Sequence, residues 1–493
     1  MYYSSTRDSS IRLSASQAVL KGLSDDGGLF VPSEFPKLSV GLDELAKLDY
    51  KKTAFTVMKG FLEDYTDEEL MACIDAAYDE KFDTPEIAPL VKADNAYYLE
   101  LFHGQTIAFK DMALSILPHL ITTAVRKNHS DKETVILTAT SGDTGKAALA
   151  GFADVPGTRI IVFYPKDGVS NIQKLQMITQ KGANTQVIGV DGNFDDCQSE
   201  VKAIFGDAGL RDLMASKGFQ FSSANSMNIG RLVPQVAYYV YAYGKLVENG
   251  RIQPGDMINV CVPTGNFGNI LAAFFAKKMG LPIKTLICAS NDNKVLYDFF
   301  KCGTYDKNRD FILTDSPSMD ILISSNLERL IYLSADCDAE KTASFMKRLS
   351  TEGKYDITPG MREFMSDFVG EFANWDESSK KIKDLYDKTG YVIDTHTAVA
   401  AAAYDKYVSE TKDDTITVIA STASPFKFAR SVLKAIDKKY ENMEDFALID
   451  ELSKVANVDI PKAIDEIKNA DILHKTVCDR AGMKKLVLDN MGL

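Results

Sequence analysis

The sequence predicts an α/β protein with two parallel β-sheets and a mainly helical N-terminal region. Two observations lead to this prediction. Short apolar runs rich in β-branched residues alternate with helical segments, and this alternation occurs in two separate stretches of the chain. Because a crossover helix joins parallel strands, such stretches form parallel sheets covered by helices on both faces. With 493 residues the chain is too long for one ordinary core, so more than one domain is expected.

The N-terminal region, residues 1–95, is predicted to be mostly helical. Residues 43–48 and 67–78 have apolar side chains at helical spacing and begin with acidic residues, which favour a helix N-terminus. Residues 26–32, with the sequence DGGLFVP, are typical of a turn that enters a short strand.

The first alternating stretch follows. Its predicted strands are residues 135–140, 159–164, 185–190 and 219–223, and its predicted helices are residues 146–152, 171–179 and 195–205. The second stretch has predicted strands at 257–263, 285–290 and 415–421, with a helix at 269–276 and a long helical part before the last strand. The tail after residue 430 is predicted to be helical and to carry many exposed charges.

Composition excludes several functions. A net charge of −13 argues against nucleic acid or an anionic membrane surface as the main partner. The seven cysteines are scattered without a CxxC pair, and the five histidines form no HExxH, so we expect reduced thiols and no metal site. The chain lacks a basic start with a following apolar stretch, and its apolar runs are too short for a membrane span. A cytoplasmic protein is therefore expected.

Lys110 is the leading catalytic candidate. It lies in residues 101–111, LFHGQTIAFKD, where apolar neighbours would bury the amine, lower its pKa and make it a nucleophile able to form a Schiff base. Far downstream, residues 263–269, PTGNFGN, connect a strand to a helix and offer backbone N–H groups to a phosphate. An aldehyde that carries a phosphate suits both segments, and pyridoxal phosphate is such a molecule.

Three further segments offer polar groups next to predicted strands or helices. Residues 141–145, SGDTG, suit a carboxylate, and residues 223–231, SANSMNIGR, suit a second anion. Residues 421–425, STASP, could place a hydroxyl at a ring nitrogen. Each segment alone also fits an ordinary turn or helix cap, and residues 263–269 match no nucleotide fingerprint.

Together these segments resemble the threonine synthases, pyridoxal-phosphate enzymes of the tryptophan-synthase β-like fold, or fold type II. The resembling segments are residues 103–111, 138–145, 225–231, 265–269 and 421–423. Residues 3–7, 22–32 and 317–329 resemble the branch found in enterobacteria and fungi. The resemblance extends from Tyr3 to about Lys427.

The resemblance implies a role for particular residues around pyridoxal 5'-phosphate. Lys110 would bind the cofactor as a Schiff base and then move protons at Cα and Cβ of the substrate. The cofactor phosphate would be held by Gly265, Asn266, Phe267, Gly268 and Asn269. Asp143 would meet the ring hydroxyl, where many relatives have Asn. Thr422 would face the ring nitrogen. Because its hydroxyl is neutral, the nitrogen would stay unprotonated and the ring would be a weaker electron sink.

The implied substrate is O-phospho-L-homoserine. Its carboxylate would be bound by Ser141 and Thr144, and its phosphate by Asn225, Ser226 and Arg231. Loss of a Cα and a Cβ proton would let phosphate leave from Cγ, and water would then add at Cβ to give L-threonine. We hypothesise that the released phosphate acts as the base for that water. No nucleic acid or membrane partner is expected, and the chain would be a monomer or homodimer.

The same resemblance implies two open, twisted, mostly parallel-sheet domains with the cofactor between them. We expect an N-terminal domain at 1–95, a large cofactor-binding domain at 96–125 and 230–430, a small mobile domain at 126–229, and a helical C-terminal extension at 431–493. Closure of the small domain would shield the reaction from water.

Other functions remain open at this point. A phospho-lyase that releases 2-oxobutyrate from the same substrate would use the same segments. A hydroxyamino-acid dehydratase is disfavoured because it needs no second phosphate site. A non-catalytic homologue that binds the cofactor or a metabolite, or a nucleotide-binding regulatory protein, is a further alternative. Three positions depart from the family pattern, namely Gln105, Lys146 and Ser424, where Pro, a small residue and His are usual.

Overall fold

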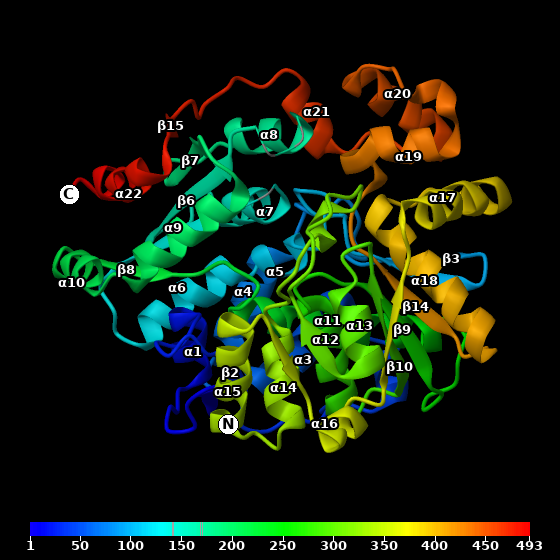
Figure 1. Cartoon of the computed structure of the whole chain (residues 1–493), viewed down its shortest axis with the longest axis horizontal. Helices are drawn as coiled ribbons and strands as arrows, with labels where there is room; N and C mark the ends of the chain where they lie inside the picture. Colours follow the sequence, from blue (N-terminus) through cyan, green and yellow to red (C-terminus); the bar gives the residue numbers. More distant parts are fainter. Residues whose placement is uncertain (141, 168, 170) are drawn as a thin grey trace.

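The computed structural model describes residues 1–140, 142–167, 169 and 171–493, and it is built around two mainly parallel β-sheets (Figure 1). The N-terminal elements are β1 (Tyr3–Ser5), α1 (Ala15–Lys21), β2 (Phe30–Pro32), α2 (Leu42–Leu45), α3 (Tyr50–Phe61) and α4 (Asp67–Ala77). Helices α1 and α4 begin with capping boxes, in which Ser14 and Thr66 accept hydrogen bonds from the backbone three residues on. β1 and β2 pair as an antiparallel ribbon.

The larger sheet positions most of the candidate site. Its strands are β3 (Leu90–Ala93), β4 (Ala96–Glu100), β9 (Ile258–Pro263), β10 (Ile283–Ser290), β13 (Phe368–Phe372) and β14 (Thr417–Ser421). In the described part of the chain they lie in the order β13–β10–β9–β14–β4–β3. Neighbouring strands are parallel except in the β3–β4 hairpin.

Helices on both faces surround the larger sheet. They are α5 (Asp111–Leu114), α6 (Leu117–Lys127), α11 (Ile229–Glu248), α12 (Gly268–Met279), α13 (Val295–Cys302), α14 (Leu327–Ser334), α15 (Ala339–Thr351), α16 (Pro359–Phe364), α17 (Trp375–Thr389) and α18 (Thr395–Thr411). The 3₁₀ turn Pro317–Met319 and the ribbon of β11 (Thr304–Asp306) and β12 (Lys354–Asp356) lie between them, and a second 3₁₀ turn, Pro425–Phe428, follows β14. Helices α12 and α18 pack directly on the strands of the sheet.

The smaller sheet is parallel between all of its neighbouring described strands. Its strands are β5 (Glu133–Ala139), β6 (Thr158–Pro165), β7 (Thr185–Val190), β8 (Phe219–Ser222) and β15 (Val477–Cys478), in the order β15–β7–β6–β5–β8. Its helices are α7 (Asp143–Phe152), α8 (Asn171–Ile178), α9 (Phe194–Gly206) and α10 (Ala208–Ser216).

The tail contains the remaining helices, α19 (Ala429–Ile436), α20 (Asp445–Ala456), α21 (Lys462–Lys468) and α22 (Met483–Met491). It runs from the larger sheet to the smaller one, coloured orange to red in Figure 1. Its short strand β15 pairs with the edge of β7. The sequence predicted the helices of the tail but gave no indication of this strand.

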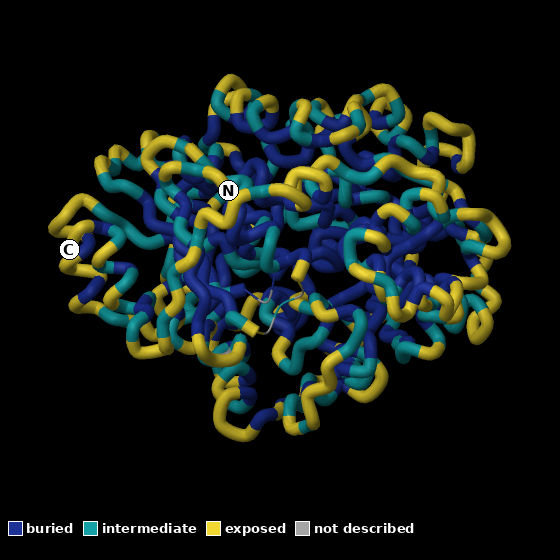
Figure 2. Tube along the Cα trace, turned by 90° about the horizontal axis from the view of Figure 1, so that it is seen from above, coloured by how far each residue is buried: buried dark blue, intermediate teal, exposed yellow. Residues whose placement is uncertain are grey.

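Side chains alternate between two apolar clusters along the central strands, as a pleated sheet covered on both faces requires. In β9, Val260 and Val262 pack into the cluster that contains α11 and α12, whereas Cys261 packs into the cluster of α17 and α18. In β6, Ile161 and Phe163 pack against α9, α10 and α22. Figure 2 shows the buried segments in the interior and the exposed segments around the periphery.

The two mainly parallel sheets and most of the strands predicted above are present. The domain boundaries remain a proposal, since β3 begins before residue 96 and β15 lies within 431–493. None of the helices in the described ranges is long and apolar enough to cross a membrane. All seven cysteines are free thiols.

Candidate active site

The loop that carries Lys110 is fixed by the chain that leaves β14. The backbone N–H of Phe109 donates to the carbonyl of Thr422 at 2.8 Å, and the N–H of Ser424 donates to the carbonyl of Ile107 at 3.0 Å. Lys110 therefore lies beyond the carboxyl ends of the parallel strands β4 and β14, where open α/β sheets bind their ligands.

The turn before Lys110 is held by a buried carboxylate. Asp111 accepts hydrogen bonds from the backbone N–H and the hydroxyl of Thr106, at 2.7 and 2.6 Å. A side chain on Gly104 would lie 2.6 Å from Asp111, so this position requires glycine. Ile107 adopts a φ of +52°, a strained conformation for a β-branched residue. These contacts define the turn although Gln105 stands where the family resemblance implies proline.

The amine of Lys110 lies in a buried polar environment. Its Nζ is 3.4 Å from Asp143 Oδ2 and 3.4 Å from Ser318 Oγ, and its side chain is 12% exposed. Burial lowers the pKa of Lys110, Asp143 opposes that effect, and the positive charges of Lys427 and Arg231 reinforce it. The burial and the lowered pKa agree with what the sequence predicted for Lys110, and its role as the nucleophile stays a prediction.

Asp143 is the charged centre of this cluster. Its Oδ1 accepts hydrogen bonds from Lys427 Nζ at 2.8 Å and Gln173 Nε2 at 3.0 Å. Burial raises the pKa of Asp143, but Lys427 and Lys110 outweigh it and hold the pKa well below its usual range. The carboxylate is therefore ionised in the folded protein.

The N-terminus of α12 has free hydrogen-bond donors. Phe267, just before the helix, has a left-handed φ of 66°, and no side chain caps the first turn. The Nδ2 atom of Asn269 is buried without a hydrogen-bond partner. A side chain on Gly265 would lie 2.6 Å from the carbonyl oxygen of Ser318, so the loop at 265 packs tightly against the chain beside Lys110.

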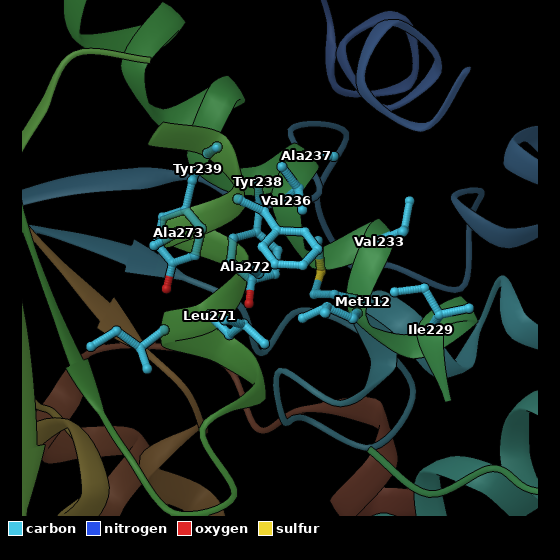
Figure 3. Close-up of a cluster of buried hydrophobic side chains, with 14 of the residues drawn as sticks. Met112, Ile229, Val233, Val236, Ala237, Tyr238, Tyr239, Leu271, Ala272 and Ala273 are labelled. Atoms are coloured by element: carbon cyan, nitrogen blue, oxygen red, sulfur yellow. The ribbon is translucent and has the colours of Figure 1, made fainter. Parts of the chain in front are cut away.

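Asn269 is also held from the side of α11. Its Oδ1 accepts a hydrogen bond from the hydroxyl of Tyr239 and lies 2.9 Å from the hydroxyl of Tyr238. Tyr238 in turn lies 3.1 Å from Gln235, whose amide donates to the carbonyl of Arg231 at 2.7 Å. Figure 3 shows the two tyrosines among the apolar side chains of α11 and α12. This polar chain connects Asn269 to Arg231.

Arg231 is buried with only partial pairing. It is 2% exposed, it donates to the carbonyl of Ala224 at 2.7 Å, and its Nε has no hydrogen-bond partner. Among the described residues it forms no ion pair with a carboxylate. Burial lowers the pKa of Arg231 to about 10. The cost of burying this cation is therefore only partly compensated by the protein.

The neighbouring loop is tied to the α12 loop through Asn326. Asn326 Nδ2 lies 3.4 Å from Ser226 Oγ and 3.0 Å from the carbonyl oxygen of Asn266. Asn225 begins the turn that leads into α11, where its carbonyl accepts from the N–H of Asn228. The two loops expected to hold the two phosphates thus share Asn326 as a common partner.

The structure thus brings Lys110, Asp143 and the α12 loop into one region. Thr422 lies in the same region, because its carbonyl accepts a hydrogen bond from the N–H of Phe109 in the Lys110 loop. Thr144 is in the first turn of α7, beside Asp143, and is partly exposed. The proposed carboxylate ligand Ser141 lies outside the described residues.

Two side chains at the site, Ser318 and Lys427, were not predicted from the sequence. Ser318 lies within residues 317–329, which contributed to the resemblance, so a local signal existed. Lys427 follows Pro425 in what looked like an ordinary helix start, and no spacing marked it. Its contact with Asp143 joins residues far apart in the sequence.

Ser318 is held in place by His396. The backbone N–H of Ser318 donates to His396 Nε2 at 3.1 Å, and His396 Nδ1 is 2.8 Å from Asp394 Oδ2. Since a backbone N–H can only donate, Nε2 must accept and the ring proton must be on Nδ1, directed to Asp394. Asp394 is fully buried and thereby sets the orientation of the ring.

Family models match successive parts of the chain. Residues 2–78 match the threonine synthase N terminus, residues 82–422 match the pyridoxal-phosphate dependent enzymes, and residues 397–477 match the C-terminal part of threonine synthase. The second match alone covers more than half of the chain. The chain belongs to the threonine synthase family of pyridoxal-phosphate-dependent enzymes.

Individual relatives agree with this assignment. The human protein threonine synthase-like 1 is 41% identical over 440 residues, which are 87% of this chain, and the chain spans 58% of the length of that protein. Threonine synthase of Schizosaccharomyces pombe is 37% identical and is matched over 94% of this chain and 98% of its own. The crystal structure of the pyridoxal-phosphate-bound threonine synthase of Brucella melitensis superposes with a TM-score of 0.86 at 32% identity and covers 100% of this chain and 98% of its own.

The resemblance, fold type II and the cofactor predicted from the sequence are therefore confirmed. The residues present fit pyridoxal phosphate, because a buried lysine with a lowered pKa lies beside an uncapped helix N-terminus and the unpartnered amide of Asn269. Among the described residues, no cluster of three or more histidine, cysteine, aspartate or glutamate side chains could hold a metal ion.

Proposed function

We propose that this chain is a threonine synthase, which converts O-phospho-L-homoserine and water into L-threonine and phosphate. The observation that carries the proposal is the buried, incompletely paired Arg231 whose charge acts on Lys110. The α12 loop supplies donors for one phosphate, so Arg231 supplies a second anion site close to the reactive lysine. A substrate with its own phosphate accounts for both sites.

The role of each residue follows from its position. Bound pyridoxal phosphate supplies the electron sink for the carbanions that form when the Cα–H and Cβ–H bonds break. The amine of Lys110, with its lowered pKa, takes and returns these protons. Arg231, Asn225 and Ser226 bind the substrate phosphate and stabilise its charge as it leaves Cγ. Asp143 and Ser318 orient the amine of Lys110.

The substrate carboxylate is assigned to Thr144 and Ser141 by the family resemblance. The N-terminus of α7, where Thr144 lies, favours a negative charge. Thr422 is assigned to the ring nitrogen of the cofactor on the same basis.

Product analysis tests this function. We expect the purified protein, given pyridoxal phosphate and O-phospho-L-homoserine, to release threonine and phosphate in equal amounts, measured by mass spectrometry and a phosphate assay. Phosphate accompanied by 2-oxobutyrate would instead identify a phospho-lyase. Unchanged substrate would contradict both functions and leave a dehydratase or a non-catalytic binding protein.

A further inference from the structure

Lys427 is a buried lysine that touches three separate parts of the molecule. Its side chain is 0% exposed. Its Nζ donates to the carbonyl of Thr106 at 3.0 Å and lies 2.8 Å from Asp143 Oδ1 and 3.5 Å from Gln176 Oε1. These partners belong to the Lys110 loop, α7 and α8, so Lys427 joins the larger sheet to the smaller one beside the site.

The two oxygens of Asp143 have different partners. Oδ1 is bound by Lys427 and Gln173, at 2.8 and 3.0 Å. Oδ2 lies 3.4 Å from Lys110 Nζ and 3.3 Å from Ser318 Oγ. The short contacts anchor one oxygen, and the longer ones leave the other free to interact with the reactive amine.

We propose that Lys427 is a positioning residue for Lys110, because it holds one oxygen of Asp143 so that the other remains directed at the Lys110 amine without pairing tightly with it. The proposal rests on the assignment of Lys110 as the lysine that binds the cofactor. It goes beyond the proposed function in assigning a role to a residue that contacts neither the amine of Lys110 nor any group assigned to the substrate.

The charges around the amine support this role. Lys427 and Arg231 are the cations whose charges act on Lys110, and Asp143 is the carboxylate that contacts both lysines. The charge of Lys427 also acts on Asp111 and Lys146, and Glu466 acts on Lys146 from α21. With Lys427 present, Asp143 divides its attraction between two lysines. Without Lys427, Lys110 would be the main cation paired with Asp143 and would keep its proton to a higher pH.

The test uses the apoprotein and added pyridoxal phosphate. The neutral amine adds to the aldehyde carbon and water is released, so the rate of bond formation, followed by absorbance from pH 6 to 10, reports the protonation of Lys110. We expect Lys427→Met to move the midpoint of this pH profile upward by about one unit. We expect Lys427→Arg, which keeps the charge, to leave the midpoint close to that of the unchanged protein.

Lys381→Met is the matched control. Lys381 is also a buried lysine, 8% exposed, and it forms an ion pair with Asp405 at 2.6 Å between α17 and α18, outside the site. This variant should lose thermal stability and keep the pH midpoint. If Lys427→Met loses stability in the same way but its midpoint is unchanged, Lys427 is only a structural ion-pair partner and the proposal is wrong.

If Lys427→Met does not fold, the same substitution can be made in a protein that already carries Asp143→Asn. Asp143→Asn removes the carboxylate that Lys427 neutralises, so the double variant should fold. If Lys427 acts through Asp143, adding Lys427→Met to Asp143→Asn should shift the midpoint by less than half a unit. A shift of a full unit there would mean a direct charge effect on Lys110 and would overturn the positioning role.

Lys110→Ala separates this proposal from the assignments on which it rests. The variant should form no bond with the cofactor in the same assay. Bond formation by Lys110→Ala would overturn the Lys110 assignment, and with it the positioning role. The reaction products are not part of this measurement, so a lyase or a synthase would give the same outcome for Lys427.

Discussion

Arg231 illustrates how a single side chain can indicate a ligand. The guanidinium is 2% exposed and has no carboxylate partner in the described part of the structure. It therefore destabilises the apoprotein, because the free-energy cost of desolvating the charge is not offset by an ion pair. Such an arrangement is retained when an anion from outside supplies the missing partner. The substrate phosphate is the anion that the family resemblance assigns to it.

Arg231→Gln should therefore separate binding from stability. We expect kcat/KM for O-phospho-L-homoserine to fall about 100-fold, because a buried charged hydrogen bond to phosphate is lost. The thermal midpoint of the apoprotein should stay unchanged or rise, because an uncompensated charge has been removed. Arg348 has a side chain that is 36% exposed and is distant in sequence from the site. Arg348→Gln should therefore change neither kcat/KM nor the thermal midpoint.

The same variant tests whether the released phosphate acts as the base for the incoming water. If it does, Arg231→Gln should release less threonine and more 2-oxobutyrate for each phosphate formed. A product ratio identical to that of the unchanged protein would exclude phosphate as the base, even if substrate affinity falls.

His103 makes the stability of this region depend on pH. Its Nδ1 contacts Asp83 at 2.6 Å and its Nε2 contacts Glu100 at 2.9 Å, with the side chain 17% exposed. Burial lowers the pKa of His103, but the hydrogen bonds to Asp83 and Glu100 outweigh it and raise the pKa to about 9 from the usual 6.5. Since the pKa is higher in the folded state, the stabilisation is complete below about pH 6.5 and is lost as the pH rises through 9.

We expect this pair of contacts to contribute about 2 kcal/mol at pH 6, after allowing for the exposure of Asp83. Urea unfolding of the unchanged protein and His103→Gln, each at pH 6 and pH 10, measures it. The stability difference between the two proteins should be largest at pH 6 and small at pH 10. A difference that is equal at both pH values would mean that His103 is not charged in the folded state.

At the scale of elements, the turn Pro317–Met319 is placed by the N-terminus of α18. Asp394 caps that helix by accepting from the N–H groups of His396 and Thr397, and it also orients the His396 ring. The ring accepts from Ser318, whose hydroxyl is 3.4 Å from the Lys110 amine. A helix cap and a reactive side chain are therefore parts of one hydrogen-bonded chain.

Asp394→Asn should disturb this chain with little change in the helix. Asparagine is a good N-cap, so α18 should remain stable. When the side-chain oxygen of the new asparagine accepts from the N–H and hydroxyl of Thr397, as Oδ1 of Asp394 does, the amide nitrogen faces His396 Nδ1. That nitrogen cannot accept the Nδ1 proton, so the ring must change tautomer and present a proton to the Ser318 N–H. We expect kcat to fall about tenfold with a thermal midpoint within about 2 °C of the unchanged protein. An unchanged kcat would show that the position of Ser318 does not matter for turnover.

The elements that the sequence predicted are those with strong local signals. The apolar run TQVIGV at 185–190 coincides with β7, and the predicted helix at 67–78, with its acidic start, coincides with α4. The loop at 265–269 could be assigned because glycine and asparagine between a strand and a helix already indicate an anion site.

The features that were missed depend on contacts between distant segments. β15 is only the two residues Val477–Cys478, and its pairing with β7 makes it a strand. Lys427 has no local feature that separates it from a surface lysine, and its role comes from Asp143 across the interface of the two sheets. His396 likewise acquires its role only through Ser318.

For the whole molecule, the tail completes the smaller sheet. Met483 and Val487 of α22 are fully buried against residues of β6 and α9, including Phe163 and Val201. The tail therefore contributes to the core of a sheet whose other strands lie far earlier in the sequence. The proposed mobility of residues 126–229 must accommodate this attachment.

Met483→Ala tests how far the smaller sheet depends on the tail. We expect a cavity that costs about 3 kcal/mol, so amide hydrogen exchange in β7 should accelerate about 100-fold. Exchange in β9 of the larger sheet should change little. Leu473→Ala, at a side chain that is 51% exposed, should leave both rates unchanged. Unchanged exchange in β7 of Met483→Ala would mean that the smaller sheet is stable without the tail.

The pairing of β15 with β7 also bears on how the chain is made in a cell. A ribosome synthesises β7 long before β15, so one edge of β7 lacks its partner while the intervening residues are added. At about 5–20 residues per second, that interval lasts on the order of tens of seconds. An apolar strand with an open edge readily pairs with another chain, and Val187, Ile188 and Val190 make β7 such a strand. The nascent polypeptide is therefore prone to aggregation at β7, and chaperones that shield this edge should raise the yield of folded protein.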